Sequence, residues 1–390
     1  FFMINKKIAF VVVFILFILS GITTYSFFSE EKSLSFLSPI TYKAPTSENG
    51  TTETAINTEP KTEECPLNGE MLSKTERKIW EGQRPLGIMI ENHKAARPQS
   101  GLSSADVIYE AVAEGGITRF LAIFYCQNAP YVGPVRSARI YFLKFLESYG
   151  QNPLYAHVGG ANTDGPADAL GYISELGWSS YNDLNQFSVP FPYFWRDYER
   201  LKNVATEHTV YTSTKKLWQY AKDKRELTNV DDKGVRWDKD FLAWKFEDDA
   251  KAGDRGKVAK IDFGFWDNLA SDFSVVWNYD IKTNSYKRTN GGVLHLDKNT
   301  GKALEAKNIV VMFAKESPAN DGYEGGHLLY KNVGSGEMLF FKNGQVVKGT
   351  WSKETEEDNI KFFDNSDKEI SIVRGQVFIE MLPIGNKVNY

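Results

Sequence analysis

Two arginines beside a serine form the part of this sequence best suited to bind an anion. Arg136 and Arg139 flank Ser137 at the start of a helix that we predict over residues 137–149. The first N–H groups of a helix lack internal partners and favour negative charge, and guanidinium groups add bidentate recognition of carboxylate or phosphate. Two further arginines lie in neighbouring motifs, and we expect them to join this group. The predicted ligand-binding residues are Arg97, Arg119, Arg136, Ser137 and Arg139.

Acidic residues in the same motifs allow two other interpretations. Glu110 or Glu114 could neutralise the arginines, and such an internal salt-bridge network accounts for the pattern as well as a bound ligand does. Alternatively, a carboxylate could act with His157, at the end of a predicted strand, in acid–base chemistry on a glycan bond. The candidate catalytic residues are therefore Glu110, Glu114 and His157. The Gly-x-Ser-x-Gly motif of a serine nucleophile is absent from the sequence. For His157, a structural role is more usual than a catalytic one.

Composition and spacing argue against several other classes of function. No Cys-x-x-Cys or His-x-x-x-His spacing is present, so we predict neither a metal site nor a cofactor. Basic and acidic residues number 46 and 50, giving a formal charge of −4 without a Lys/Arg cluster. That balance argues against nucleic-acid binding.

The amino-terminal segment predicts a membrane location. Lys6 and Lys7 precede an uncharged stretch over residues 8–28, long enough to cross roughly 30 Å of hydrocarbon as a helix. We expect residues 1–28 to be a single-pass anchor with a cytoplasmic amino terminus, and a cleaved signal peptide is the alternative. In both cases the bulk of the chain is extracytoplasmic. Residues 29–80 are acidic and poor in aliphatic residues, which predicts a disordered tether.

The two cysteines are expected to pair. An extracytoplasmic compartment is oxidising, and Cys65 with Cys126 leaves no odd thiol. In the chain-entropy view, closing a loop of this size stabilises the fold by roughly 4 kcal/mol. The alternative is two unpaired cysteines, one in the tether and one in the core.

Periodicity divides the remaining chain into two folded parts. Residues 81–225 alternate strands with helices and predict an α/β or α+β domain. Residues 226–255 are charged and form the expected linker. Residues 256–390 predict a mostly antiparallel β domain, with Asn343-Gly344 as a hairpin turn. Local predictions for the first part include a helix start at Ser103 and Asp106, and helices over 137–149, 164–176 and 212–222.

Several long motifs recur in an order that resembles a known family. They are Met89-Ile-Glu-Asn-His, Ala96-Arg-Pro-Gln-Ser-Gly-Leu, Ala105-Asp-Val-Ile-Tyr-Glu, Glu114-Gly-Gly-Ile-Thr-Arg and Gly133-Pro-Val-Arg-Ser-Ala-Arg, followed by Tyr286-Lys-Arg, Gly291-Gly-Val-Leu-His and Gly349-Thr-Trp. The chain is similar to the YerB-like bacterial lipoproteins over roughly residues 84–383. The resemblance implies an envelope protein with an α/β amino-terminal part and a β-rich carboxyl-terminal part. It supplies no established catalytic residues.

One departure from this family affects the predicted anchor. Many members carry a lipid-modified cysteine directly after the signal, whereas this chain has Ser20-Gly21-Ile22 there and Cys65 far beyond. We therefore expect a protein anchor in place of a lipid. The sequence as a whole predicts a binding or scaffolding module that recognises an anionic ligand on a cell-wall polymer or envelope protein. The alternative is an envelope hydrolase or transferase acting on a wall glycan or peptide, and a third possibility is that the motifs only stabilise the fold.

Overall fold

The computed structural model describes residues 59–390. The predicted anchor and residues 29–58 of the predicted tether lie outside the described residues. Within residues 59–390, no helix combines the length and apolar character needed to cross a bilayer.

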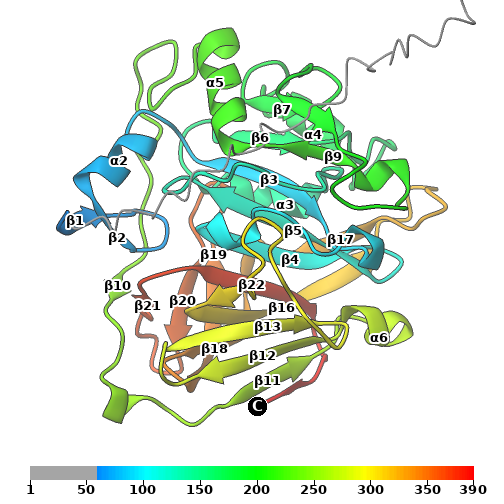
Figure 1. Ribbon diagram of the computed structural model, residues 1–390. Coiled ribbons are helices and arrows are strands. Elements are labelled where there is room, and N and C mark those ends of the chain that lie inside the picture. Colours follow the sequence, from blue (N-terminus) through cyan, green and yellow to red (C-terminus); the bar gives the residue numbers. More distant parts are fainter. Residues whose placement is uncertain (1–58) are drawn as a thin grey trace, which may run out of the picture. The chain divides into compact units, whose positions relative to one another are not determined.

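A mixed sheet of eleven strands forms the centre of the fold (Figure 1). Its strand order is β20-β19-β18-β16-β22-β4-β5-β3-β6-β7, and β17 pairs with β16. The amino-terminal part contributes β3 (Leu86–Glu91), β4 (Val107–Glu114), β5 (Ile117–Phe124), β6 (Leu154–His157) and β7 (Asp183–Asn185). The carboxyl-terminal part contributes β16 (Asn308–Pro318), β17 (Leu328–Lys331), β18 (Gly334–Lys342), β19 (Gln345–Lys353), β20 (Lys361–Asp364) and β22 (Val377–Pro383).

The two parts of the chain join within this sheet. Strand β22 runs parallel to β4, with Val377 opposite Val107 and Glu380 opposite Glu110. The first seven of the eight residues of β4, over 107–113, are buried, which is the pattern of a strand covered on both faces. Backbone hydrogen bonds of one continuous sheet therefore join the two parts of the chain.

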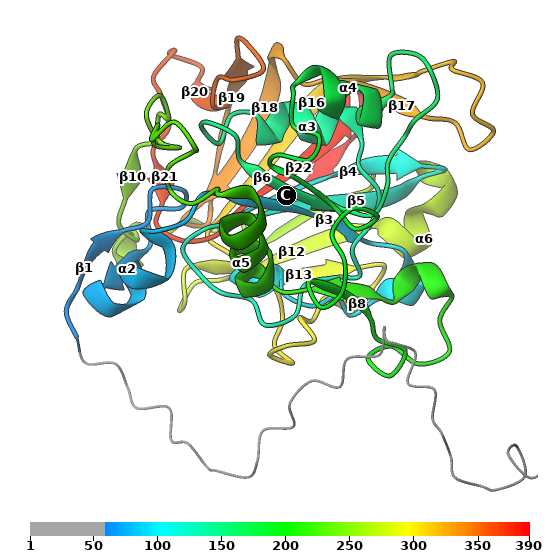
Figure 2. The same ribbon diagram turned by 90° about the horizontal axis from the view of Figure 1, so that it is seen from above.

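Helices cover one face of the amino-terminal strands. They are α3 (Ile140–Leu146), α4 (Ala169–Glu175) and α5 (Thr214–Arg225), which Figure 2 shows in front of the strands. The ring of Phe145 in α3 stacks on Tyr109 of β4 at 4.3 Å between centroids. All three helices were predicted, but α3 and α4 are shorter than expected.

Because α3 begins later than predicted, Arg136 and Arg139 lie before the helix and not in its first turn. Residues before Ile140 are extended, because Val135 bridges to Ile90 and Ala138 bridges to Gly160. Arg139 is the residue before the helix, and its side chain makes no capping bond. The prediction of a helix starting at residue 137 is therefore wrong, and Arg136 belongs to an extended segment.

A second sheet, of six strands, packs against the other face of the main sheet. Its order is β14-β13-β12-β11-β23, with β15 also on β13. The ring of Phe378 in β22 meets Trp277 of β12 at 5.0 Å between centroids. The strands are β11 (Lys260–Phe263), β12 (Val275–Asp280), β13 (Ser285–Asn290), β14 (Val293–Leu294), β15 (Glu305–Ala306) and β23 (Val388–Asn389). The predicted hairpin at Asn343-Gly344 connects β18 to β19.

Short elements complete the described chain. They are the strand pairs β1 (Lys61–Glu64) with β2 (Met71–Ser73), β8 (Phe194–Arg196) with β9 (Val210–Thr212), and β10 (Phe246–Glu247) with β21 (Ile372–Val373), and the helices α2 (Lys74–Trp80) and α6 (Ala270–Phe273). Single 3-10 turns lie at Lys94–Ala96, Leu102–Ser104, Thr206–His208, Ala252–Asp254 and Asp267–Leu269.

The prediction of disorder up to residue 80 is wrong for residues 61–80. These residues form β1, β2 and α2, and the predicted Cys65–Cys126 disulfide attaches them to the end of β5. Leu67, Leu72 and Trp80 are buried in the core. Sequence composition missed this because a few apolar side chains and one covalent link suffice to order a short, otherwise polar segment.

The predicted helix start at Ser103 and Asp106 is also wrong. Gly101 takes a left-handed φ of 94°, and only one 3-10 turn follows it before β4. The carboxylate of Asp106 accepts hydrogen bonds from the backbone N–H groups of Tyr125 and Cys126 at 2.7 and 3.0 Å. Asp106 thus fixes the end of β5 beside the disulfide rather than capping a helix.

Candidate functional site

The register of the main sheet separates the predicted site residues into two groups. Strand β5 places Phe120 beside Glu110 and Arg119 beside Ala111. Because neighbouring residues of a strand point to opposite faces, Arg119 and Glu110 lie on opposite sides of the sheet. Arg119 is on the face covered by helices, and Glu110 is on the face covered by the second sheet.

The helix-side group is the arginine cluster, made of Glu91, Glu114, Arg119, Arg136, Arg139 and His208. Glu114 pairs with Arg119 at 3.0 Å and with Arg139. Arg119 also donates to the carbonyl of Ser137 at 3.3 Å. The structure therefore brings four of the five predicted ligand-binding residues together, and it gives two of the arginines a shared carboxylate.

Glu91 is the second carboxylate of the arginine cluster. It pairs with Arg136, and its Oε2 lies 3.4 Å from Nδ1 of His208, whose ring stacks on His93. Burial raises the pKa of Glu91, but the His208 hydrogen bond and the charges of Arg136 and Arg119 outweigh it and hold the pKa below its ordinary value. Glu91 is therefore ionised at neutral pH, and it was not among the predicted site residues.

The arginine cluster contains more positive than negative charge. Three guanidinium groups face two buried or half-buried carboxylates, and the exposed Glu207 attracts Arg136 without forming an ion pair with it in the described structure. The Nε atoms of Arg119 and Arg139 are buried without a hydrogen-bond partner among the described residues. Arg136 is 25% exposed, so the cluster is reachable from solvent.

His157 is not arranged as a catalytic base. Its Nε2 lies 2.6 Å from Oδ1 of Asp183, and its Nδ1 lies 2.7 Å from the carbonyl oxygen of Gly159. Both ring nitrogens therefore face acceptors, and neither is free to take a proton from a substrate.

Glu110 and His157 are also far apart. Their strands, β4 and β6, are separated by β5 and β3, a distance of about 14 Å at ordinary strand spacing. The pairing of Ala156 with Ile88 places His157 in a row that faces away from Glu110. The structure thus does not unite this pair of predicted catalytic residues.

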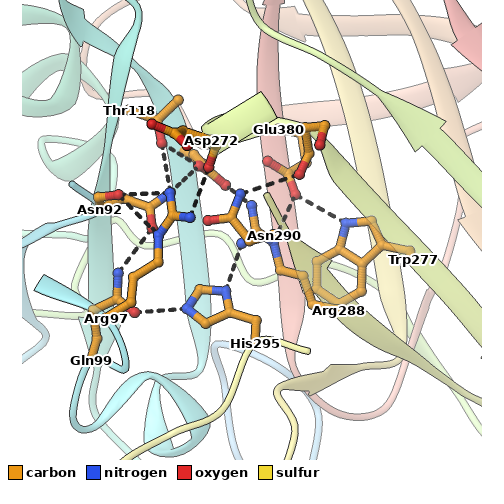
Figure 3. A network of polar contacts seen from close by, with 12 residues as sticks. Asn92, Arg97, Gln99, Thr118, Asp272, Trp277, Arg288, Asn290, His295 and Glu380 are labelled. Atoms are coloured by element: carbon orange, nitrogen blue, oxygen red, sulfur yellow. Dashed lines mark hydrogen bonds and ion pairs between the residues drawn. The ribbon is translucent and has the colours of Figure 1, made fainter. Parts of the chain in front are cut away.

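The second group is a buried polar network between the two sheets (Figure 3). The amino-terminal part supplies Asn92, Gln99, Glu110 and Thr118, and the carboxyl-terminal part supplies Arg288, His295 and Glu380. All seven side chains are buried. We call this group the inter-sheet network.

The donor and the acceptor of each hydrogen bond in the inter-sheet network can be assigned, starting from Arg288. Arginine can only donate, so Arg288 donates to Nδ1 of His295 at 2.6 Å, and Nε2–H of His295 donates to Gln99 at 2.7 Å. Gln99 donates to Asn92 at 2.9 Å, and Asn92 donates to Glu110 at 2.9 Å. Arg288 also binds Glu110 directly, which closes the circuit. Burial and the charge of Arg288 lower the pKa of His295 well below its ordinary value, so its ring is neutral.

Glu380 adds a second carboxyl group beside Glu110. Its Oε1 accepts from the indole of Trp277 at 3.0 Å and lies 3.6 Å from Nε of Arg288. Burial, followed by the negative charge of Glu110, raises the pKa of Glu380 well above its ordinary value. Glu380 is therefore held in its neutral form beside the ion pair of Arg288 with Glu110.

Arg97 belongs to this side of the sheet and not to the arginine cluster. It donates to the carbonyl of Asn92 at 2.8 Å and to the carbonyl of Asp272 at 2.8 Å, and its guanidinium lies over the ring of Phe273. Burial and the charge of Arg288 lower its pKa to about 10. The expectation that Arg97 joins Arg119 is therefore not met, because they lie on opposite sides of the sheet.

Sequence reasoning missed Arg288, His295 and Glu380. A signal was present in each case. Arg288 and His295 end two of the motifs already noted, and Glu380 is the single acid in the apolar run over 377–382.

One group of side chains in the described chain has the types and proximity of metal ligands. It consists of Cys65, Asp106 and Cys126. The two sulfur atoms are joined in the disulfide, so neither is a thiolate that could bind a metal.

The fold and its two polar groups define a two-part protein in which a mixed α/β region and a mostly antiparallel β region share one sheet. Family models bear this out. Residues 69–228 match the N-terminal domain, and residues 265–379 the C-terminal domain, of "Protein of unknown function (DUF3048)". The chain belongs to this YerB-like family, as its motifs predicted.

A sequence comparison and a structure comparison agree with this family assignment. The chain is 32% identical over 324 residues to "Putative lipoprotein YerB" of Bacillus subtilis (strain 168), covering 82% of this chain and 86% of the relative. The crystal structure of YerB from Bacillus subtilis matches with a TM-score of 0.67 at 28% identity, covering 84% of this chain and all of the other.

Proposed function

We propose that this protein is a binding or scaffolding module of the cell envelope that holds an anionic group on Arg119, Arg136 and Arg139. The observation that carries the proposal is the surplus of one guanidinium charge in the arginine cluster. The buried Nε–H groups of Arg119 and Arg139 have no partner among the described residues and add unused donor capacity there. A carboxylate or phosphate would complete both the charge balance and the hydrogen bonding.

The proposed location is the outer face of the cytoplasmic membrane. A buried disulfide is typical of proteins that fold in an oxidising compartment. The Bacillus subtilis relative is named a lipoprotein, a class held at a membrane. In this chain the uncharged stretch over residues 8–28 would anchor the protein instead of a lipid.

The partner that best fits this location is an anionic cell-wall polymer or an acidic envelope protein. A hydrolase that uses Glu110 or Glu114 with His157 receives no support from the contacts. Glu110 and His157 face opposite sides of the sheet, and Glu114 is paired with Arg119 and Arg139. Binding without turnover is accordingly the function we favour.

Sedimentation with purified cell-wall sacculi tests the proposal. The full chain is expected to co-sediment at low salt, and Arg136→Ala is expected to reduce retention roughly tenfold while Arg136→Lys keeps part of it. Arg236→Ala is the matched control, because Arg236 is 56% exposed and pairs only with its neighbour Asp238. Its retention should equal that of the unchanged protein.

Three results would contradict the proposed binding function. Release of soluble wall fragments would show an enzyme. Absence of retention at low salt, or equal loss in Arg136→Ala and Arg236→Ala, would exclude wall binding through the arginine cluster.

A further inference from the structure

A cavity of about 380 Å³ lies apart from the arginine cluster, where a loop of the amino-terminal part meets the edge of the second sheet. Lys94, Arg97 and Pro98 form one wall, and Asn290, Val293 and Leu294 form the other. This volume lies within the range of pockets that hold small ligands. Arg97 and Pro98 in one wall, and Val293 and Leu294 in the other, lie in motifs shared with the family, and the proposed function does not use them.

The apolar side of the cavity belongs to an open sheet edge. Val293 and Leu294 are 70% and 51% exposed, and β14 is the last strand of its sheet. Thr289 lies opposite Leu294, and the N–H of His295 bonds to the carbonyl of Arg288. Because ladder bonds alternate along an antiparallel pair, the N–H and C=O of Leu294 point away from β13. The edge therefore offers main-chain groups together with two aliphatic side chains.

The floor of the cavity contains an unused hydrogen-bond acceptor. Asn290 is 2% exposed, and its Oδ1 has no partner in the described chain. Its amide nitrogen makes one long bond to the carbonyl of Ser274 at 3.4 Å. A buried amide oxygen without a donor is costly, so an N–H or O–H group from a ligand would stabilise it.

The polar rim has a surplus of positive charge. Lys94 pairs with Asp272 at 2.9 Å, and Arg97 contacts only the backbone carbonyl of that aspartate. Behind the wall, Arg288 and Glu110 balance each other. One positive charge beside the cavity is thus without a counter-ion in the described structure, and the Lys94–Asp272 pair is exposed enough to rearrange.

We infer that this cavity binds the carboxyl-terminal residue of a peptide that ends in an aliphatic side chain. The terminal carboxylate would face Lys94 and Arg97, the amide N–H would donate to Asn290, and the side chain would lie against Val293 and Leu294. Such a residue complements three features of the cavity. Its carboxylate matches the surplus positive charge, its N–H matches the unused acceptor of Asn290, and its side chain matches the apolar side.

Calorimetric titration of the full chain with acetyl-Ala-Ala-Leu tests this inference. Binding should weaken roughly tenfold or more for the same peptide as its carboxyl-terminal amide, and for acetyl-Ala-Ala-Ser with a free carboxylate. Lys94→Glu and Leu294→Ser should each weaken binding to a similar extent. Both positions are solvent-exposed, so these variants are expected to fold.

Matched controls come from the opposite end of the β12–β13 hairpin. Ile281 is 50% exposed and Lys282 is also exposed, and neither lines the cavity. Ile281→Ser and Lys282→Glu should bind as the unchanged protein does, and so should Arg136→Ala, which separates this site from the arginine cluster. Equal binding of acid and amide peptides, no binding at millimolar concentration, or equal losses in test and control variants would each overturn the inference.

Discussion

Glu110 and Glu380 are register partners on the adjacent parallel strands β4 and β22. Each comes from a different part of the chain, and their carboxyl groups meet at Arg288, between the two sheets. Arg288 pairs with Glu110, and burial raises the pKa of Glu380 well above its ordinary value. The pair therefore stabilises the junction only while Arg288 is present.

Removal of Arg288 is expected to destabilise the protein strongly. Arg288→Met leaves Glu110 buried without its counter-ion and should lower the free energy of unfolding by about 3–5 kcal/mol. Glu380→Gln should change it by less than about 1 kcal/mol, because a neutral amide can accept from Trp277 and donate to Glu110 in the same way. Urea denaturation followed by tryptophan fluorescence measures both. A larger loss in Glu380→Gln than in Arg288→Met would contradict this protonation pattern.

The buried carboxyl group of Glu147 is expected to make the stability of the folded protein depend on pH. Burial raises its pKa to about 7, although Tyr172 donates to it at 2.9 Å. A carboxyl whose pKa is higher in the folded state favours folding fully below the ordinary value of about 4.5, and this contribution is lost as pH rises through 7. Glu147→Gln should therefore be more stable than the unchanged protein at pH 8, by roughly 1–3 kcal/mol, and equal to it near pH 4. Thermal unfolding at the two pH values checks this, and a larger advantage at pH 4 would reverse the assigned sign.

The disulfide is expected to hold residues 61–80 on the core. Replacement of both Cys65 and Cys126 by serine should lower the free energy of unfolding by about 4 kcal/mol, according to the chain-entropy relation for the observed separation of 61 residues. Limited proteolysis should then cut β1 or α2 first. If the cleavage pattern is unchanged, the buried Leu67, Leu72 and Trp80 suffice to hold this segment.

Substitution of Glu114 by a neutral residue increases the net positive charge of the arginine cluster. Glu114→Gln removes the carboxylate shared by Arg119 and Arg139, and should lower stability by about 3 kcal/mol. Added sulfate should restore part of the loss, because an anion that binds only the folded state stabilises it. Glu81→Gln is the control, since Glu81 is 52% exposed and forms only a 3.4 Å pair with Arg77. A sulfate effect of equal size in both variants would show general salt stabilisation in place of a site.

The sequence by itself determined the alternation of strands and helices in the amino-terminal part, the β-rich character of the carboxyl-terminal part, the disulfide and the family. Alternation of apolar residues located β3 to β6 and the carboxyl-terminal strands, and Asn343-Gly344 located a hairpin, because these signals depend on neighbours in the chain. The cysteine pair followed from its count and compartment. The order of the motifs identified the family without contact information.

The tertiary structure decided which of the predicted site residues contact one another and which do not. Arg119 faces the helices because of the two-residue periodicity of β5, whereas Arg97 lies in the loop after β3 and contacts Asp272 on the side of the second sheet. Arg288, His295 and Glu380 reach Glu110 only because β22 adds to β4 and the second sheet covers that face. Arg288 and Glu110, for example, are 178 residues apart in the chain, and no local pattern encodes their contact.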